Sequence, residues 1–213
     1  MSTLPDPPAA LPAPRTTTIT TGTRLWRIHS TTRRPNTPNP TVQPSPRRGG
    51  RFDSLDGSYA YLYLGDTPNA AVAETLCRNL PVDQTPRLLP HSQIAGRSLT
   101  ELEILTDLHV ADLTGTGSAR INAGSWLTHS DPSGYLTTRR WAAAILTAHP
   151  HLAGLQYRPR HNDNQTAWML ATPTADDHQA LAATWTVELD TPQGRALLTP
   201  LLAEHNAALP LSP

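Results

Sequence analysis

Residues 59–64 constrain the fold of this chain more than any other segment, because a helix start follows them directly. Their sequence, Tyr-Ala-Tyr-Leu-Tyr-Leu, is aromatic and apolar and predicts a strand. Asp66 or Thr67 can cap a helix, and Pro68 fits its first turn, which predicts a helix from Pro68 to about Asn79. The fold must therefore accommodate a strand that passes into a helix after a very short connection.

The remaining patterns predict several strands and few helices, without the regular alternation of a doubly wound sheet. We expect strands over 24–29, within 97–112, and over 153–157, 165–171 and 182–189, and helices over 137–148 and from 191 onward. Pro200 should kink or split the last helix. The stretch 114–134 is rich in Gly, Ser and Asn and is predicted to lie outside the core. Together these elements indicate an α+β fold.

The length and composition indicate one domain with tails. The chain has 213 residues, of which 38% are hydrophobic and 22 are proline, so part of it should remain outside the core. We expect a flexible Pro/Thr-rich N-terminal tail over 1–22, a single domain over 23–208 and a C-terminal tail over 209–213. Residues 31–48 read as a long Arg- and Pro-rich loop, and loops of this length are often functional.

The charged residues and the single cysteine exclude several kinds of site. The 17 basic residues are all Arg and are balanced by 17 acidic residues, so the chain has no net charge and no lysine for a Schiff base or a P-loop. Cys77 alone cannot form an internal disulfide or a cysteine zinc site. The nine histidines show no metal-ligand spacing, and no Gly-x-Ser-x-Gly motif is present, so we expect neither a metal site nor a hydrolase triad.

The N-terminal residues and the hydropathy pattern bear on location. No apolar run approaches 20 residues, which indicates that the chain has no transmembrane helix. Residues 1–15 lack the basic start and apolar stretch of a secretory signal. A cytoplasmic protein without a membrane partner is therefore expected.

Four features follow one another along the chain in an order that is informative as a set. They are Arg27 in the first predicted strand, the segment Gly49-Gly50-Arg51-Phe52, Tyr63 in the central strand, and Glu74 in Pro68-x-x-Ala71-Val72-Ala73-Glu74. Gly154-Leu155-Gln156-Tyr157-Arg158 and Ala167-Trp168-Met169-Leu170 come later. From about residue 25 to 170, this order resembles the RES domain family, which is named for its Arg, Glu and Ser residues.

The resemblance implies both a fold and an activity. RES proteins resemble ADP-ribosyltransferases: a compact α+β domain has a mixed or antiparallel β-sheet core, a few flanking helices and a cleft that binds NAD. Characterised members consume NAD as a substrate, by hydrolysis or by transfer to phosphate or a protein, and many are toxins. Such a toxin is paired with an Xre-type antitoxin that covers the cleft, and a macromolecular acceptor of ADP-ribose is a further implied partner.

The matching residues suit these roles chemically. Arg27 and Arg51 would clamp phosphate or ribose groups through the paired donors of the guanidinium. Gly50 would let the backbone approach the ligand, and Tyr63 would stack on nicotinamide or hydrogen-bond the substrate. Glu74 would stabilise the positive charge that develops on the ribose when the nicotinamide–ribose bond breaks. The catalytic candidates are thus Glu74, Tyr63 and Arg27, and the candidates for NAD binding are Arg27, Gly50, Arg51 and Tyr63.

Each of these residues also has a plain structural interpretation. Arg27 could be an outward strand residue, and the glycine pair could be a turn. Tyr63 could be a core aromatic beside Tyr61, and Glu74 could be a solvated helix residue paired with the arginine four positions later.

The chain departs from the family pattern at one position. The family serine is expected near residue 159, where this chain has Pro159, which offers neither a hydroxyl nor an amide donor. Arg158, Arg160 or Ser125 could substitute for it, or the activity could be weakened or lost. We therefore keep two alternatives to an NAD glycohydrolase: an ADP-ribosyltransferase that uses the 31–48 loop to contact a protein or nucleic acid, and a non-catalytic module that binds NAD or ADP-ribose.

Overall fold

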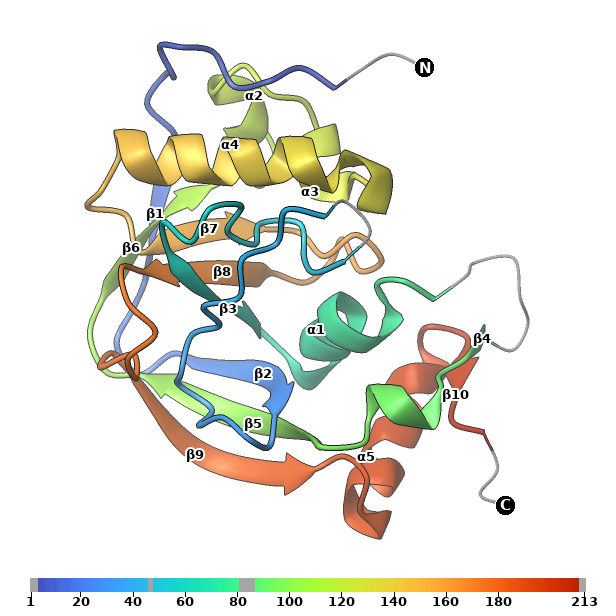
Figure 1. The fold of residues 1–213 in the computed structure, drawn as a ribbon. Helices are drawn as coiled ribbons and strands as arrows, with labels where there is room; N and C mark the ends of the chain where they lie inside the picture. The colour runs from blue at the N-terminus through green and yellow to red at the C-terminus, as the bar shows by residue number, and fades with distance from the viewer. Residues whose placement is uncertain (1–3, 46–47, 81–86, 211–213) are drawn as a thin grey trace.

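The main structural element is an eight-stranded, curled sheet (Figure 1) in a computed structural model that describes residues 4–45, 48–80 and 87–210. In their order across the sheet, the strands are β1 (Thr16–Ile19), β6 (Leu108–Asp112), β7 (Gly154–Tyr157), β8 (Ala167–Thr172), β3 (Ala60–Gly65), β2 (Arg24–Ser30), β5 (Arg97–Ile104) and β9 (Leu181–Glu188). Strands β6 and β7 are parallel, and all other neighbours are antiparallel. The mixed sheet expected from the sequence is confirmed.

Three longer helical segments flank the sheet, which confirms the α+β class. They are α1 (Pro68–Val72), which continues directly as the π-helix η1 (Ala73–Cys77), α4 (Tyr135–Ala148) and α5 (Pro192–Ala203). The shorter elements are α2 (Gly117–Arg120), α3 (Trp126–His129), the 3₁₀-helices η2 (His91–Gln93) and η3 (Pro132–Gly134), and the parallel pair β4 (Arg87–Leu88) and β10 (Ala207–Ala208). Within the described ranges, no helix is long and apolar enough to cross a membrane.

Two local predictions about helices can be compared with the structure. Thr67 caps α1, where its hydroxyl accepts a hydrogen bond from the amide of Ala70 at 3.0 Å, and Pro68 occupies the first turn as predicted. Helix α5 is not split at Pro200 and continues to Ala203. Pro200 is exposed, so water can bind the carbonyl group that loses its amide donor there.

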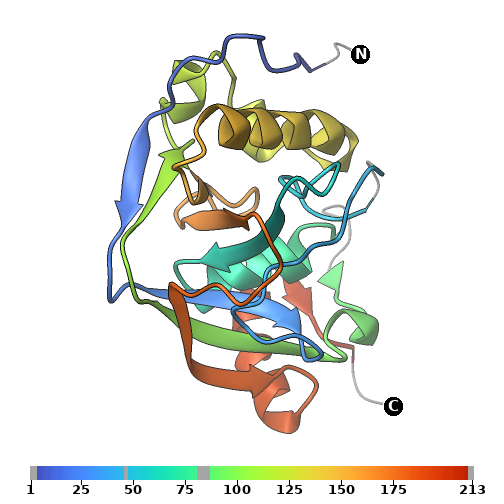
Figure 2. The same ribbon diagram turned by 60° about the vertical axis from the view of Figure 1, so that its left-hand side comes forward.

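The hydrophobic core has three parts. Helix α4 packs on one half of the sheet, and α1 with α5 packs on the other half (Figures 1 and 2). The third cluster consists of strand residues alone, from Ile19 in β1 to Leu181 in β9. The expectation that residues 114–134 lie outside the core is wrong for Ile121 and Leu127, which are fully buried against α4 because the short helices α2 and α3 fold over it.

The N-terminal segment differs from the flexible tail that we expected. Thr16–Ile19 forms β1 and pairs with β6, since β-branched Thr and Ile favour an extended chain and Ile19 is buried. Before β1, the chain passes α4 (Figure 2), and the carbonyl of Pro5 accepts a hydrogen bond from the indole of Trp141 at 2.9 Å. The parts of the expected tails at 1–3 and 211–213, and residues 46–47 of the long loop, lie outside the described residues.

The sheet opens between β2 and β3, and this opening positions the site. Strand β2 pairs with β5 along all seven of its residues, but with β3 only at Trp26 and Gly65. Where β3 is not paired with β2, the loop after β2 pairs with it through a bridge between Asn39 and Tyr61. The loop thus enters the gap between two neighbouring strands.

Candidate active site

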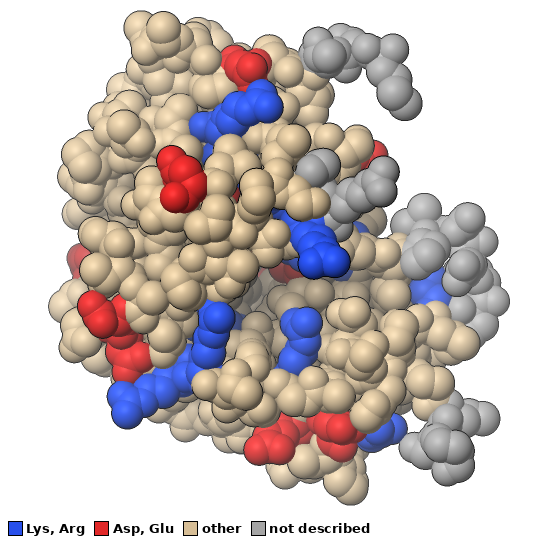
Figure 3. Space-filling model, in the orientation of Figure 1, with Lys and Arg blue, Asp and Glu red and all other residues tan. Residues whose placement is uncertain are grey.

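A cleft of about 610 Å³ lies at the opening between β2 and β3. Arg27 and Tyr63 line it from the two strands, Glu74 from η1, and Gly50 from the end of the loop. Basic side chains gather around the hollow on this face of the molecule (Figure 3). The volume is in the range of small-molecule sites, and the structure brings four of the five predicted site residues to one cavity.

Glu74 is a buried carboxylate at the wall of the cleft. It is only 5% exposed, and its Oε2 accepts a hydrogen bond from the Tyr157 hydroxyl at 2.8 Å. Its Oε1 accepts from the backbone amide of Arg160 at 3.4 Å, and the guanidinium of Arg51 lies 3.8 Å from Oε2. The interpretation of Glu74 as a solvated residue paired with Arg78 is therefore wrong. The wider π-helical turn places Glu74 toward the cleft, as π-helical turns at functional sites often do.

Arg51 lies behind Glu74 and not at the cleft wall. Its side chain is 1% exposed, and the rings of Phe52, Tyr135 and Tyr157 surround its guanidinium at 5.7–5.9 Å. Among the described residues, no acceptor is within hydrogen-bond distance of its three nitrogens. The residues found to line the cleft do not include Arg51. In this structure its contact is with Glu74, so it differs from the phosphate clamp that the resemblance implies.

Gly50 and Tyr63 are joined through Asp53, which the sequence did not single out. The Asp53 carboxylate accepts hydrogen bonds from the Gly50 amide at 2.7 Å and from the Tyr63 hydroxyl at 2.8 Å. A Cβ atom on Gly50 would lie 2.6 Å from both the Tyr63 hydroxyl and Asp53 Oδ1, so only glycine fits. Burial and the nearby Asp53 raise the pKa of Tyr63 well above its usual value, which keeps the phenol protonated. The hydroxyl of Tyr63 is thus hydrogen-bonded within the protein, and the residue lines the cleft.

Arg139 is a second site residue that sequence reasoning missed. This fully buried arginine of α4 donates to the carbonyls of Gly50 at 2.9 Å and of Gln43 and Ser45 at 2.7 Å, and also to the carbonyl of Arg48. It therefore fixes the segment that leads into the glycine pair. A signal was present in the sequence, because Arg139 lies on the same helix face as the buried residues of α4, where a cation needs acceptors.

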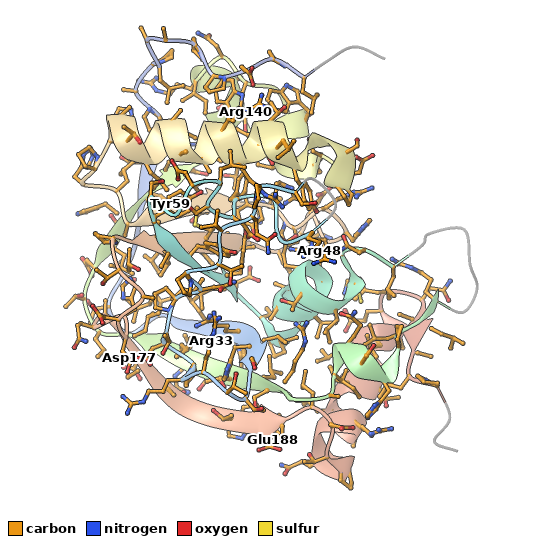
Figure 4. All side chains as sticks on the ribbon, in the orientation of Figure 1. Arg33, Arg48, Tyr59, Arg140, Asp177 and Glu188 are labelled. Carbon is orange, nitrogen blue, oxygen red and sulfur yellow. The ribbon has the colours of Figure 1, made fainter. Side chains whose placement is uncertain are left out.

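Arg27 faces the cleft and also anchors the loop beside it. Its Nη1 donates to the carbonyls of Pro35 at 2.5 Å and Thr37 at 2.9 Å. Burial, with a smaller contribution from the charge of Arg33, lowers the pKa of Arg27 to about 10. Asp177, in the segment between β8 and β9, holds the same loop because its carboxylate accepts a hydrogen bond from the Thr37 hydroxyl at 2.5 Å. Figure 4 shows Asp177 and Arg33 of this loop.

The groups that could replace the family serine lie in different places. Pro159 is buried, and Arg158 donates to the carbonyl of Gln165 at 2.9 Å. The cleft-lining residues do not include Ser125, Arg158 or Arg160, although the amide of Arg160 reaches Glu74. Over the described ranges, no three His, Cys, Asp or Glu side chains are grouped closely enough to bind a metal ion.

Comparisons with known proteins place the chain in a family. A search of curated proteins found no match. The fold is similar to a chain in the crystal structure of the M. tuberculosis MbcT–MbcA toxin–antitoxin complex, with a TM-score of 0.55 and 19% identity over 81% of this chain and 86% of that one. The family model described as the RES domain matches residues 24–190, which is most of the chain and contains every residue of the cleft described above. The chain therefore belongs to the RES domain family, as the order of its motifs predicted.

Proposed function

We propose that this protein is the NAD-consuming toxin of a toxin–antitoxin pair and that it cleaves the nicotinamide–ribose bond of NAD in the cytoplasm. The observation that carries the proposal is the buried Glu74 carboxylate, which faces a polar cleft that arginines line. Membership of the RES domain family, and a fold similar to a chain of a toxin–antitoxin complex, support the same function.

In the proposed mechanism, charged side chains stabilise the charges of the substrate during bond cleavage. As the bond between ribose C1′ and the pyridinium nitrogen breaks, its electron pair leaves with nicotinamide and the ribose becomes cationic. Glu74 stabilises that cation, either directly or through the ribose hydroxyls. Arg27 binds a phosphate oxygen, and the ring of Tyr63 stacks on nicotinamide, since its hydroxyl is held by Asp53. An acceptor such as water then bonds to C1′ and loses a proton.

The test compares wild-type protein with Glu74→Gln, which removes the charge but retains an acceptor for Tyr157. We expect purified wild-type protein to release nicotinamide from NAD and the variant to do so at least about 100-fold more slowly. In cells, NAD should fall and growth should stop with the wild type only. Equal turnover by the two proteins, or intact NAD with both while both remain folded, would contradict the proposal.

Two alternatives to this function are transfer of ADP-ribose to a macromolecule and binding without catalysis. Transfer of ADP-ribose to a macromolecule is favoured by Arg33, because it lies in the Arg-rich loop and also lines the cleft. Labelled NAD would then mark a protein or nucleic acid in a lysate. A non-catalytic module is favoured by Pro159, which supplies no hydroxyl. Binding of ADP-ribose without any turnover of NAD would identify that case.

The proposed partner is an Xre-type antitoxin that covers the cleft. Its binding would block access to Glu74 and Arg27 together, because both lie in the same cavity. Co-expression with such a partner should restore growth and protect the NAD pool. If growth is restored while NAD still falls, the partner acts elsewhere.

A further inference from the structure

The carboxylate of Glu74 has one short hydrogen bond, and it comes from a residue outside the cleft. The Tyr157 hydroxyl is 2.8 Å from Glu74 Oε2, whereas the Arg160 amide is 3.4 Å from Oε1 and the Arg51 guanidinium is 3.8 Å from Oε2. Hydrogen bonds to a carboxylate are strong and depend on geometry, so the shortest of these contacts determines the orientation of the carboxylate most strongly.

Tyr157 is placed rigidly enough to control that orientation. It is fully buried in β7, where its backbone pairs with Ala167 of β8, and its ring packs edge-on against Phe52. The contact joins the sheet to η1 across 83 residues of sequence. A carboxylate on a short π-helical turn is thereby held by a donor that belongs to the central sheet.

Tyr157 remains a donor under all ordinary conditions. Burial, followed by the negative charge of Glu74, raises the pKa of its phenol well above the usual value. The other charged or titratable groups that face Glu74 are Arg51 from the loop, Arg78 from the same helix, and His161 after β7. Only Tyr157 among them has a side-chain hydrogen bond to the carboxylate in the described structure.

We propose that Tyr157 is a positioning residue, which holds the Glu74 carboxylate in the orientation needed for NAD cleavage. This inference rests on the proposed function, because it assigns a partner to the group that we place in the reaction. Tyr157 is absent from the described residues that line the cleft, so it acts through Glu74 and not on the substrate.

Tyr135 provides a matched control for the experiment. It is also a buried tyrosine with its ring 5.9 Å from the guanidinium of Arg51, but no described group is hydrogen-bonded to its hydroxyl. Tyr157→Phe and Tyr135→Phe therefore each remove one buried hydroxyl from the same cluster and retain the ring. Only the first of them removes a bond to Glu74.

Two measurements on these variants test the inference. With NAD, we expect Tyr157→Phe to lower kcat about 10- to 100-fold with little change in KM, and Tyr135→Phe to change neither by more than about 2-fold. Without NAD, the ¹³C resonance of the Glu74 side-chain carboxyl should move in Tyr157→Phe and remain in place in Tyr135→Phe. Thermal melts confirm that each variant is folded.

The outcomes separate this inference from the proposed function. Unchanged kcat in Tyr157→Phe, or an equal shift of the Glu74 resonance in both variants, would overturn the positioning role. If the wild type consumes no NAD but the resonance moves in Tyr157→Phe alone, the positioning role holds and the proposed reaction fails.

Discussion

Two buried arginines, Arg139 and Arg51, lie against the ring of Tyr135 but differ in their hydrogen bonding. Arg139, in α4, donates hydrogen bonds to four backbone carbonyls of the segment leading to Gly50. Arg51 has three nitrogens without a hydrogen-bond acceptor among the described residues, and its nearest anionic group is the Glu74 carboxylate.

This difference indicates what each side of the cleft contributes. The guanidinium of Arg139 stabilises the loop that it holds, because its hydrogen bonds join four residues of the loop to one buried cation of α4. A guanidinium without such bonds is unfavourable for folding and persists where its charge has another use. The loop side of the cleft, the segment that Arg139 holds, is thus stabilised by hydrogen bonds. The Glu74 side, where the Arg51 guanidinium meets the carboxylate on η1, carries the electrostatics of the proposed reaction.

The largest expected effect is that of Arg139→Leu. The substitution removes the donor of four hydrogen bonds to backbone carbonyls, and we expect the free energy of unfolding to fall by about 3–5 kcal/mol. Urea denaturation measures this change. The neighbouring Arg140→Leu is the control, because it removes only an exposed ion pair with Asp6 and should change stability by about 0–1 kcal/mol. Equal losses of stability in Arg139→Leu and Arg140→Leu would show that the hydrogen bonds of Arg139 do not stabilise the loop.

An intermediate effect is expected for Gly50→Ala on the loop side. The added Cβ would be 2.6 Å from the Tyr63 hydroxyl, so the loop or β3 must shift, at a cost of about 1–3 kcal/mol in unfolding free energy. The same substitution combined with Tyr63→Phe should lose less than the sum of the single losses, since one of the two closest clashes, that with the phenol oxygen, is gone while the one with Asp53 remains. Strict additivity in a double-mutant cycle would show that contact with the Tyr63 hydroxyl does not cause the loss of stability in Gly50→Ala.

On the Glu74 side, removal of the charges of both Arg51 and Glu74 should change the free energy of unfolding little. We expect Arg51→Met combined with Glu74→Gln to remain within about 1 kcal/mol of the wild type, or to exceed it, because replacing a buried ion pair is often neutral or stabilising. Urea denaturation should therefore show that the double variant retains its stability, while an assay of nicotinamide release should show that it has lost turnover. A loss of stability comparable with that of Arg139→Leu would show that Arg51 is structural after all.

The smallest effect concerns Arg27, whose pKa burial lowers to about 10. The guanidinium is charged below this value and neutral above it, so affinity for ADP-ribose should fall about 2-fold between pH 8 and pH 10. Folding changes in the opposite direction: above about pH 10 the unfolded chain, in which the pKa of Arg27 is not lowered, binds more protons than the folded chain, so this group favours folding as the pH rises. Calorimetric titration should show the decrease in wild type and none in Arg27→Gln, and an equal decrease in both would exclude Arg27 as its source.

Local sequence patterns predicted the parts of this fold that depend on nearby residues. The strand at Tyr63 and the Thr67 cap were accessible in this way. The mixed sheet and the joint placement of Arg27, Gly50 and Glu74 were expected from the resemblance to the RES domain family and not from local patterns. Alternation and capping chemistry suffice for the strand and the cap because each involves a short stretch of chain.

The features that were missed depend on contacts between distant segments. Asp53 is recognisable as a site residue only from its bond to Tyr63, and Arg51 could be placed behind Glu74 only from the packing of three aromatic rings. The helix face of Arg139 signals a buried cation, but its acceptors follow only from the folded loop. The strand that begins at Thr16 forms only by pairing with β6, and its first pair, Thr16 with Ala111, joins residues 95 positions apart. No local pattern contains such information.

The π-helical turn that carries Glu74 has a consequence for how this protein can vary during evolution. A π-turn holds one more residue than the α-helical turn it replaces, and each residue of an α-helix turns the chain by about 100°. Deleting a single residue between Pro68 and Glu74 would let the helix become regular and would rotate Glu74 away from Tyr157. Descendants of this chain can therefore exchange side chains in the helix more freely than they can change its length.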